Sequence, residues 1–141
     1  MTGHAERRFT ALAVAAREPL LALAERVLAE VDDVALLAVP GPATMLVELT
    51  ESVGGQPYHL CEVVVSEASV AVRGYRGDAV VVGADAERAL AAAVCDAAAE
   101  AGLFPGEIEE LVATALAARD DAQARRAAAV AATRVDLEVL G

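Results

Sequence analysis

The residues with the clearest potential for chemistry are a histidine and a cysteine two positions apart, His59 and Cys61. In an extended segment, residues two apart share a face, so this imidazole and thiol would lie side by side. A closed zinc site needs four ligands. The remaining soft ligands, His4 and Cys95, show no CxxC or HxxxH spacing. The pattern therefore favours burial of Cys61 in a sheet and predicts neither a metal site nor a CxxxCxxC iron–sulfur cluster in this chain.

Acid–base and nucleophilic catalysis have weak candidates. The adjacent carboxylates fall at predicted helix ends or on polar faces, where acids are usually solvated. None of the three serines lies in a GxSxG motif. We therefore expect no catalytic residue among these side chains, which are Asp32-Asp33, Glu109-Glu110, Asp120-Asp121, Ser52, Ser66 and Ser69.

Anion binding would need a glycine-containing loop ahead of a helix or a cluster of cations. Gly83-Ala84-Asp85 is such a loop, but a carboxylate at the helix cap repels an anion. Arg125 and Arg126 suit a solvated helix face near the negative end of a helix dipole. Arg134 lies where the predicted long helix gives way to an apolar tail, so we expect an interface or structural role for it. We predict no cofactor bound by this chain.

The composition excludes further classes of function. The 141 residues carry 22 acids and 11 bases, a net charge of −11, and every base is arginine. Without lysine there is no P-loop or Schiff-base lysine. The acidic surface argues against binding nucleic acid or an anionic membrane. We find no leader-like segment and no apolar run near the ~20 residues that span a bilayer, so we expect a cytoplasmic protein.

The periodicity of apolar residues predicts which elements position these side chains. Four helices are expected. The first is at 6–17, the second has Pro19 in its first turn, the third is at 86–101 and the fourth is at 106–133. Asp85 and Gly102 should cap the third helix. Period-two segments predict strands at 34–39, 44–50, 58–65, 67–72 (as an extension or a re-pairing) and 79–82. Pro40-Gly41-Pro42 should end the first of these strands, and turns are expected at 54–57 and at 74–77.

Strands and helices are segregated along the chain, which indicates one α+β domain over 1–141. We expect an antiparallel meander of about 4–5 strands with N-terminal and C-terminal helices on one face. The apolar stripe of the last helix fades beyond Arg119, which suggests that a partner holds its second half. Residues 135–140 are expected to form an edge strand or docking tail, and 133–141 is the docking segment of the domain.

Three segments, in this order, are similar to those of one known family. Gly54-Gly55, Tyr58, Glu62 and Ser66-x-Ala68-x-Val70 form a central block preceded by Thr44-Met45-Leu46-Val47. Gly83-Ala84-Asp85 is followed by an alanine-rich helix with Asp96, and the chain ends with Ala132-Thr133-Arg134-Val135-Asp136. These segments resemble the G subunit of the bacterial carbon–phosphorus lyase core complex, with Cys61 and Ala84 departing from the family pattern.

This resemblance implies a role in phosphonate catabolism. With the H, I and L subunits, the G subunit takes part in converting ATP and methylphosphonate into α-D-ribose 1-methylphosphonate 5-triphosphate, with release of adenine. The base-displacing chemistry is attributed to the I subunit, and the later carbon–phosphorus cleavage to the J subunit. The resemblance thus implies an accessory or non-catalytic subunit within a core complex of I, H and J subunits, for which ATP and phosphonate are substrates of the whole complex.

Our hypothesis is that the strand block around Glu62 and the tail from Thr133 to Leu140, with Arg134, Val135 and Asp136, contact the I subunit. Self-association is expected when the chain is expressed alone. Two alternatives stay open. One is a stand-alone small-molecule-binding module with a closed pocket lined by His59, Arg73 and Glu62. The other is a free-standing small hydrolase or transferase, which predicts turnover by the pure chain.

Overall fold

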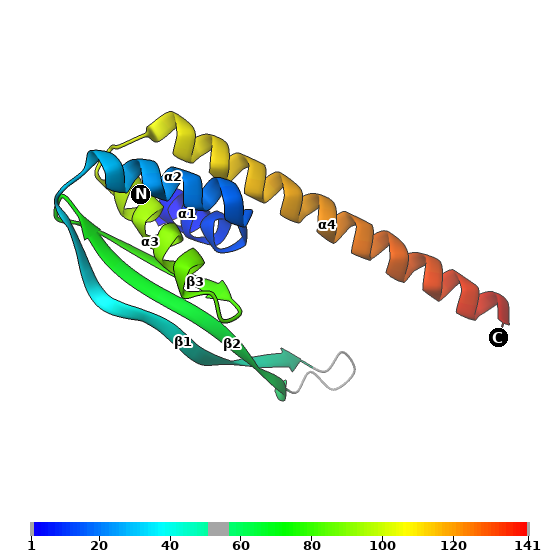
Figure 1. Ribbon diagram of the computed structural model, residues 1–141. Helices are drawn as coiled ribbons and strands as arrows, with labels where there is room; N and C mark the ends of the chain where they lie inside the picture. Colours follow the sequence, from blue (N-terminus) through cyan, green and yellow to red (C-terminus); the bar gives the residue numbers. More distant parts are fainter. Residues whose placement is uncertain (1, 51–56, 141) are drawn as a thin grey trace.

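In the described part of the chain, four helices lie on one face of one antiparallel sheet, which confirms the predicted α+β class (Figure 1). The structure is a computed structural model that describes residues 2–50 and 57–140, with side chains for 3–46 and 62–132. The elements in chain order are α1 (Thr2–Val14), α2 (Arg17–Glu30), β1 (Val34–Thr50), β2 (Pro57–Val72), β3 (Tyr75–Val82), α3 (Ala86–Glu100) and α4 (Pro105–Leu140).

The helices lie on one face of the sheet, whose strand order is β1-β2-β3 (Figure 1). Helix α3 packs directly on β2 and β3, and α1 and α2 cover α3. The small side chains of α3 allow a very close approach to the sheet. A Cβ added at Gly77 of β3 would lie 2.3 Å from the carbonyl oxygen of Ala93 and from the amide nitrogen of Ala97.

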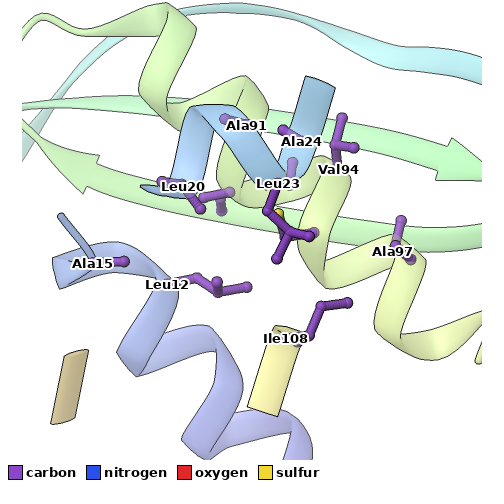
Figure 2. Close-up of a cluster of buried hydrophobic side chains, with 14 of the residues drawn as sticks. Leu12, Ala15, Leu20, Leu23, Ala24, Ala91, Val94, Ala97 and Ile108 are labelled. Carbon is purple, nitrogen blue, oxygen red and sulfur yellow. The ribbon is translucent and has the colours of Figure 1, made fainter. Parts of the chain in front are cut away.

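The hydrophobic core joins all four helices to the sheet. Figure 2 shows how side chains from α1, α2, α3 and the first turns of α4 converge. Leu12, Leu20 and Val94 are almost fully buried there. Because α3 contributes mostly alanine and valine, the larger side chains of the other helices fill the space around it.

The sheet has three strands among the described residues, so the predicted count of 4–5 is not confirmed. Pro40-Gly41-Pro42 was expected to end a strand, but β1 runs through it with register shifts between Leu36 and Gly41. β1 is an edge strand, where a proline can sit at a bulge or with its nitrogen facing away from the ladder. The segment at 67–72 extends β2 without re-pairing.

The turn expected at 74–77 lies instead at Arg73 and Gly74, so it begins one residue earlier and ends three residues earlier than predicted. Arg73 and Gly74 form the two-residue connection, with φ of 52° and 83°. Positive φ at both central positions matches the right-handed twist of a hairpin, and it lets β3 begin at Tyr75. The predicted strand at 79–82 is therefore the second half of β3.

The first two helices meet at a sharp corner. Helix α1 ends at Val14, three residues before the predicted end, because Ala16 is extended (φ −60°, ψ 139°). Arg17 then opens α2, and Pro19 occupies its first turn as expected, where its missing N–H has no cost.

Helix α4 continues to Leu140, so the backbone of 135–140 is helical and the edge strand expected there is wrong. Residues 135–140 follow an alanine-rich stretch at 127–132 and include the good helix formers Leu137, Glu138 and Leu140, so the helix continues through them. The role of 133–141 as a docking segment stays a prediction.

Candidate functional site

Two arms project from the body of the protein in the same direction (Figure 1). One is the far end of the β1–β2 hairpin. The other is the second half of α4. Because both extend past α1, α2 and α3, neither is covered by the helical layer.

The hairpin arm, residues 39–46 of β1 with 62–67 of β2, carries several exposed apolar side chains, whereas Val65 and Ser66 at its base, beside β3, are buried. Gly41 pairs with Glu67 and Leu46 with Glu62 across this arm. Val39 is 88% exposed, and Met45, Leu46 and Val64 are about half exposed. Exposed apolar groups gathered on one projection are typical of an interaction surface.

Helix α4 is fastened to the body only along its first three turns. Ile108, Leu111, Val112 and Ala115 are buried against the core. Arg7 forms an ion pair with Glu109 at 2.9 Å. These contacts fix residues 105–116, and the chain beyond them leaves the body.

A second fastening lies at the very start of α4. The guanidinium of Arg26 lies 4.9 Å from the ring centroid of Phe104 and pairs with Glu107 at 3.3 Å. Phe104 itself has φ of 47°, an uncommon conformation for a large side chain. The backbone at Phe104 and the Arg26 contacts therefore set the direction in which α4 leaves the body.

The distal helix, residues 117–140, confirms the predicted fading of the apolar stripe. Its described side chains, 117–132, are exposed or half-buried, and Val130 is 59% exposed. An alanine-rich helix without tertiary packing is only marginally stable in water. The distal helix therefore has the character of a segment completed by a partner.

The residues predicted to form the partner interface lie on these two arms. Glu62 is exposed on the hairpin arm. Thr133, Arg134, Val135 and Asp136 lie on the distal helix, and their side chains are outside the described residues. The structure thus places the predicted interface on two separate projections from the same body.

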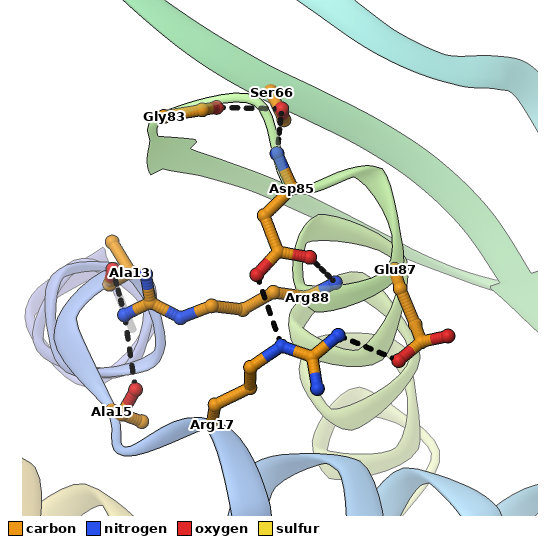
Figure 3. A network of polar contacts seen from close by, with 8 residues as sticks. All are labelled: Ala13, Ala15, Arg17, Ser66, Gly83, Asp85, Glu87 and Arg88. Carbon is orange, nitrogen blue, oxygen red and sulfur yellow. Dashed lines mark hydrogen bonds and ion pairs between the residues drawn. The ribbon is translucent and has the colours of Figure 1, made fainter.

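The loop at Gly83-Ala84-Asp85 is not an anion site, because its polar groups are already paired (Figure 3). The Asp85 amide donates to Ser66 Oγ at 2.9 Å, and Ser66 Oγ donates to the Gly83 carbonyl at 2.7 Å. The Asp85 carboxylate accepts from the Arg88 amide at 3.1 Å, as the predicted helix cap. The protein's own carboxylate occupies the position that a phosphate would take.

Electrostatics around Asp85 agree with this assignment. The Arg88 amide and the ion pair with Arg17, at 3.1 Å, lower the pKa of the Asp85 carboxyl. Arg88 also links α3 to the end of α1, where its guanidinium donates to the carbonyls of Ala13 and Ala15 (Figure 3). It satisfies acceptors left open at the end of α1, so it acts as a structural cap.

The most buried charge cluster is one that sequence reasoning missed. Asp96 of α3 accepts a 2.6 Å hydrogen bond from Arg8 Nε and one from the Asp78 amide at 3.0 Å. Arg8 also pairs with Glu100. These residues line an open cavity of 760 Å³. The one signal in the sequence was a lone carboxylate within the alanine-rich stretch at 89–99.

This cluster is balanced rather than reactive. Burial alone would lower the pKa of Arg8, but its hydrogen bonds to Asp96 and Glu100 raise it. On the cavity rim, a hydrogen bond from Arg76 and one from Ser69 lower the pKa of Asp78. These hydrogen bonds favour the charged form of Asp78, and Arg8 occupies the carboxylates of Asp96 and Glu100.

The predicted carboxylate pairs do not form catalytic dyads in the described part of the chain. Glu109 pairs with Arg7, and Asp121 pairs with Arg125 at 3.4 Å on the exposed distal helix. The backbone carbonyl of Asp33 accepts the amide of Arg73 at 2.8 Å, beside the hairpin turn. These acids serve as surface charges and turn residues.

The described residues of the small-molecule alternative, Arg73 and Glu62, do not share a closed pocket. Arg73 lies at the β2–β3 turn, whereas Glu62 lies towards the opposite end of β2, and both are exposed. The side chains of His59 and Cys61 fall outside the described residues. Residues 3–46 and 62–132 contain no group of three potential metal ligands.

Cys95 is a core residue. It is fully buried in α3, and burial raises the pKa of its thiol to about 12. A protonated, enclosed thiol is neither a nucleophile nor a ligand. Within the described ranges, no helix combines the length and apolar character needed to cross a membrane.

Comparison with known proteins identifies relatives of this chain. Residues 5–141 match the family described as phosphonate metabolism protein PhnG. A curated protein of Rhizobium meliloti (strain 1021), the alpha-D-ribose 1-methylphosphonate 5-triphosphate synthase subunit PhnG, is 37% identical over 101 residues. The match covers 70% of this chain and 65% of that relative, so it spans just under two thirds of the relative's length.

Proposed function

This chain belongs to the PhnG family of phosphonate metabolism proteins, and we propose that it is an accessory subunit of an α-D-ribose 1-methylphosphonate 5-triphosphate synthase. In this role it contributes no catalytic residue and binds no cofactor. Its place is in the cytoplasm, where ATP and methylphosphonate are substrates of the assembled complex. The observation that supports the proposal is the pair of uncovered arms on a body whose most buried charges, Arg8 and Asp96, are already paired with each other.

The arms are suited to protein contact. The hairpin arm exposes apolar side chains without a covering layer, and the distal helix lacks an apolar face of its own. Burying the exposed apolar side chains of the hairpin arm in a complex gains about 25 cal/mol for each Å² of apolar area. A protein of net charge −11 also repels free ATP and phosphonate, so it is poorly suited to holding them alone.

We propose that both arms contact the I subunit, within an assembly that also contains the H and J subunits and works with the L subunit. Glu62 stands on the hairpin arm, and the segment from Thr133 to Asp136 on the distal helix. Since the two arms project in one direction, a single partner can occupy both.

The test is co-purification after co-expression with the I-type subunit. The full chain is expected to bring the partner down, and a chain ending at Ala132 is expected to lose most of it. Glu62→Arg should weaken capture, whereas Glu25→Arg makes the same charge change on the exposed face of α2 and should not. Unchanged capture by both the truncated chain and Glu62→Arg would contradict the proposed interface.

A second measurement addresses catalysis. Adenine release from ATP in the presence of methylphosphonate should require this chain together with the H, I and L subunits. The purified chain alone should release none. Turnover by the pure chain would overturn the assignment as an accessory subunit.

A further inference from the structure

The outer edge of β1 is an unpaired row of backbone groups. In the described sheet β1 pairs with β2 alone, so its other side faces no strand. Long, uncharged edge strands are places where another chain readily adds a strand. Residues 34–46 of β1 contain no charged side chain.

The register shows which groups face outward. The carbonyl of Val64 in β2 accepts a hydrogen bond from the Gly83 amide at 2.8 Å, on the β3 side. In an antiparallel strand the N–H and C=O of one residue point to the same side. Val64 therefore faces away from β1. Since Thr44 pairs with Val64, this is a non-hydrogen-bonded pair, and the N–H and C=O of Thr44 face the open edge.

The same reasoning extends to the neighbouring residues. The register is continuous from Gly41 to Val47, so Pro42 and Leu46 face the same way as Thr44. A proline has no N–H, and an outward position in an edge strand is where it is tolerated. Pro42 therefore offers no outward hydrogen-bond donor at the N-terminal end of this stretch of edge. The free donors are the amides of Thr44 and Leu46, and the carbonyls of Pro42, Thr44 and Leu46 are free acceptors.

From this geometry we infer that the edge of β1 at 42–46 binds an extended, basic segment of another synthase subunit as a fourth strand. This inference rests on the proposed function, because it names how the hairpin arm holds its partner. Met45 and Leu46, on opposite faces of the strand, give the added segment apolar neighbours above and below the sheet.

Charge favours a different chain over a second copy of this one. The charged side chains among 34–46 and 62–72 are Glu62 and Glu67, and both are exposed. A second copy would bring the same acids together, along with its own net charge of −11. A segment that carries arginine or lysine beside its apolar residues would instead meet two unpaired carboxylates.

The geometry itself is testable by amide hydrogen exchange on the isolated chain. The amides of Thr44 and Leu46 should exchange quickly, whereas those of Ala43 and Met45, which face β2, should exchange slowly. In the complex with the co-expressed subunits, the Thr44 and Leu46 amides should become protected. Slow exchange at Thr44 in the free monomer would overturn the inference.

The decisive variant is Thr44→Pro, which removes one outward amide as Pro42 already does, with Thr44→Val as the control that keeps it. Thr44→Pro should weaken partner capture by about tenfold or more, and Thr44→Val should not. Leu46→Pro gives a second removal should Thr44→Pro lose its β-sheet circular dichroism.

The outcomes separate this inference from the function on which it rests. If the wild-type chain captures the subunits and both proline variants capture them equally well, strand addition is wrong and the accessory role stands. If the wild-type chain captures none, both fail. If the wild-type chain instead forms a dimer that Thr44→Pro dissociates, the occupant is a second copy and the inference is overturned.

Discussion

Arg8 Nε donates a 2.6 Å hydrogen bond to Asp96 Oδ1, joining α1 to α3, and the same carboxylate accepts the backbone amide of Asp78 from β3 at 3.0 Å. The Asp96 side chain thus connects α1, which is 88 residues away in the sequence, with α3 and the preceding strand β3. Only 15% of the Arg8 side chain and 12% of the Asp96 side chain are exposed. The pair therefore lies largely outside the screening of solvent.

Asp96→Ala should destabilise the protein by about 3 kcal/mol, because it leaves Arg8 without its more buried partner and the Asp78 amide without an acceptor. Urea unfolding followed by circular dichroism measures this. Glu109→Ala, which removes the exposed ion pair with Arg7, is the control and should cost less than about 1 kcal/mol. Equal losses of unfolding free energy in the two variants would show that the buried network contributes no more to stability than an exposed ion pair.

Gly77→Ala should be among the most damaging single-methyl additions. The new Cβ would lie 2.3 Å from backbone atoms of Ala93 and Ala97, which cannot rotate away. We expect a loss of about 3 kcal/mol or more as α3 is forced off the sheet. Gly41→Ala is the matched control, since nothing lies within 4 Å of its added Cβ. Comparable stability of the two variants in thermal melts would contradict the close packing.

Acid should weaken the fold through Asp78 and Asp85. Their pKa values are lowered in the folded state, by a hydrogen bond from Arg76 and by the Arg88 amide respectively. The unfolded chain takes up these protons near about pH 4, before the folded chain does. Their contribution is therefore fully present above that pH and is lost as pH falls through the folded pKa values.

The variant Asp85→Asn keeps a side chain that can cap α3 but removes the titrating group. Its melting temperature should decline less steeply than that of the wild type between about pH 6 and pH 3. Asp120→Asn, on the exposed distal helix, should follow the wild-type profile. A wild-type profile for Asp85→Asn as well would rule out this carboxylate as a source of acid sensitivity.

Cys95 should resist alkylation in the folded protein. With its thiol pKa raised to about 12 by burial, only about one thiol in ten thousand is ionised at pH 8. In a Cys61→Ser background, iodoacetamide should label Cys95 only after denaturant is added, as mass spectrometry would show. Rapid labelling of the native protein would mean that α3 opens frequently.

Local signals predicted the parts of the fold that local chemistry decides. Asp85 at the cap of α3, Gly102 after it and Pro19 in the first turn of α2 follow from backbone chemistry within one turn, and all three are found. The small side chains of α3 also explain its close approach to the sheet, which is seen at Gly77.

The sequence-based predictions were wrong where the structure depends on residues that are far apart in the sequence. Pro40 and Pro42 end a central strand but are tolerated on an edge, and the order of the strands is not visible in a local pattern. The partners of Asp96 lie 88 and 18 residues away, so no spacing rule could find them. The sequence indicated the two arms only as the strand block around Glu62 and a last helix with a fading apolar stripe, because their common direction depends on the whole body.

The attachment of α4 gives that helix mechanical leverage. Its 36 residues extend about 54 Å, and about 36 Å of this lies beyond the last anchored turn near Ala115. A tilt of about 10° at Phe104 would displace the far end by about 9 Å, more than the spacing between neighbouring strands. The contacts of Arg26 with Phe104 and Glu107 therefore fix the angle between α4 and the body. How rigidly they hold that angle determines how precisely the C-terminal end of α4 is positioned.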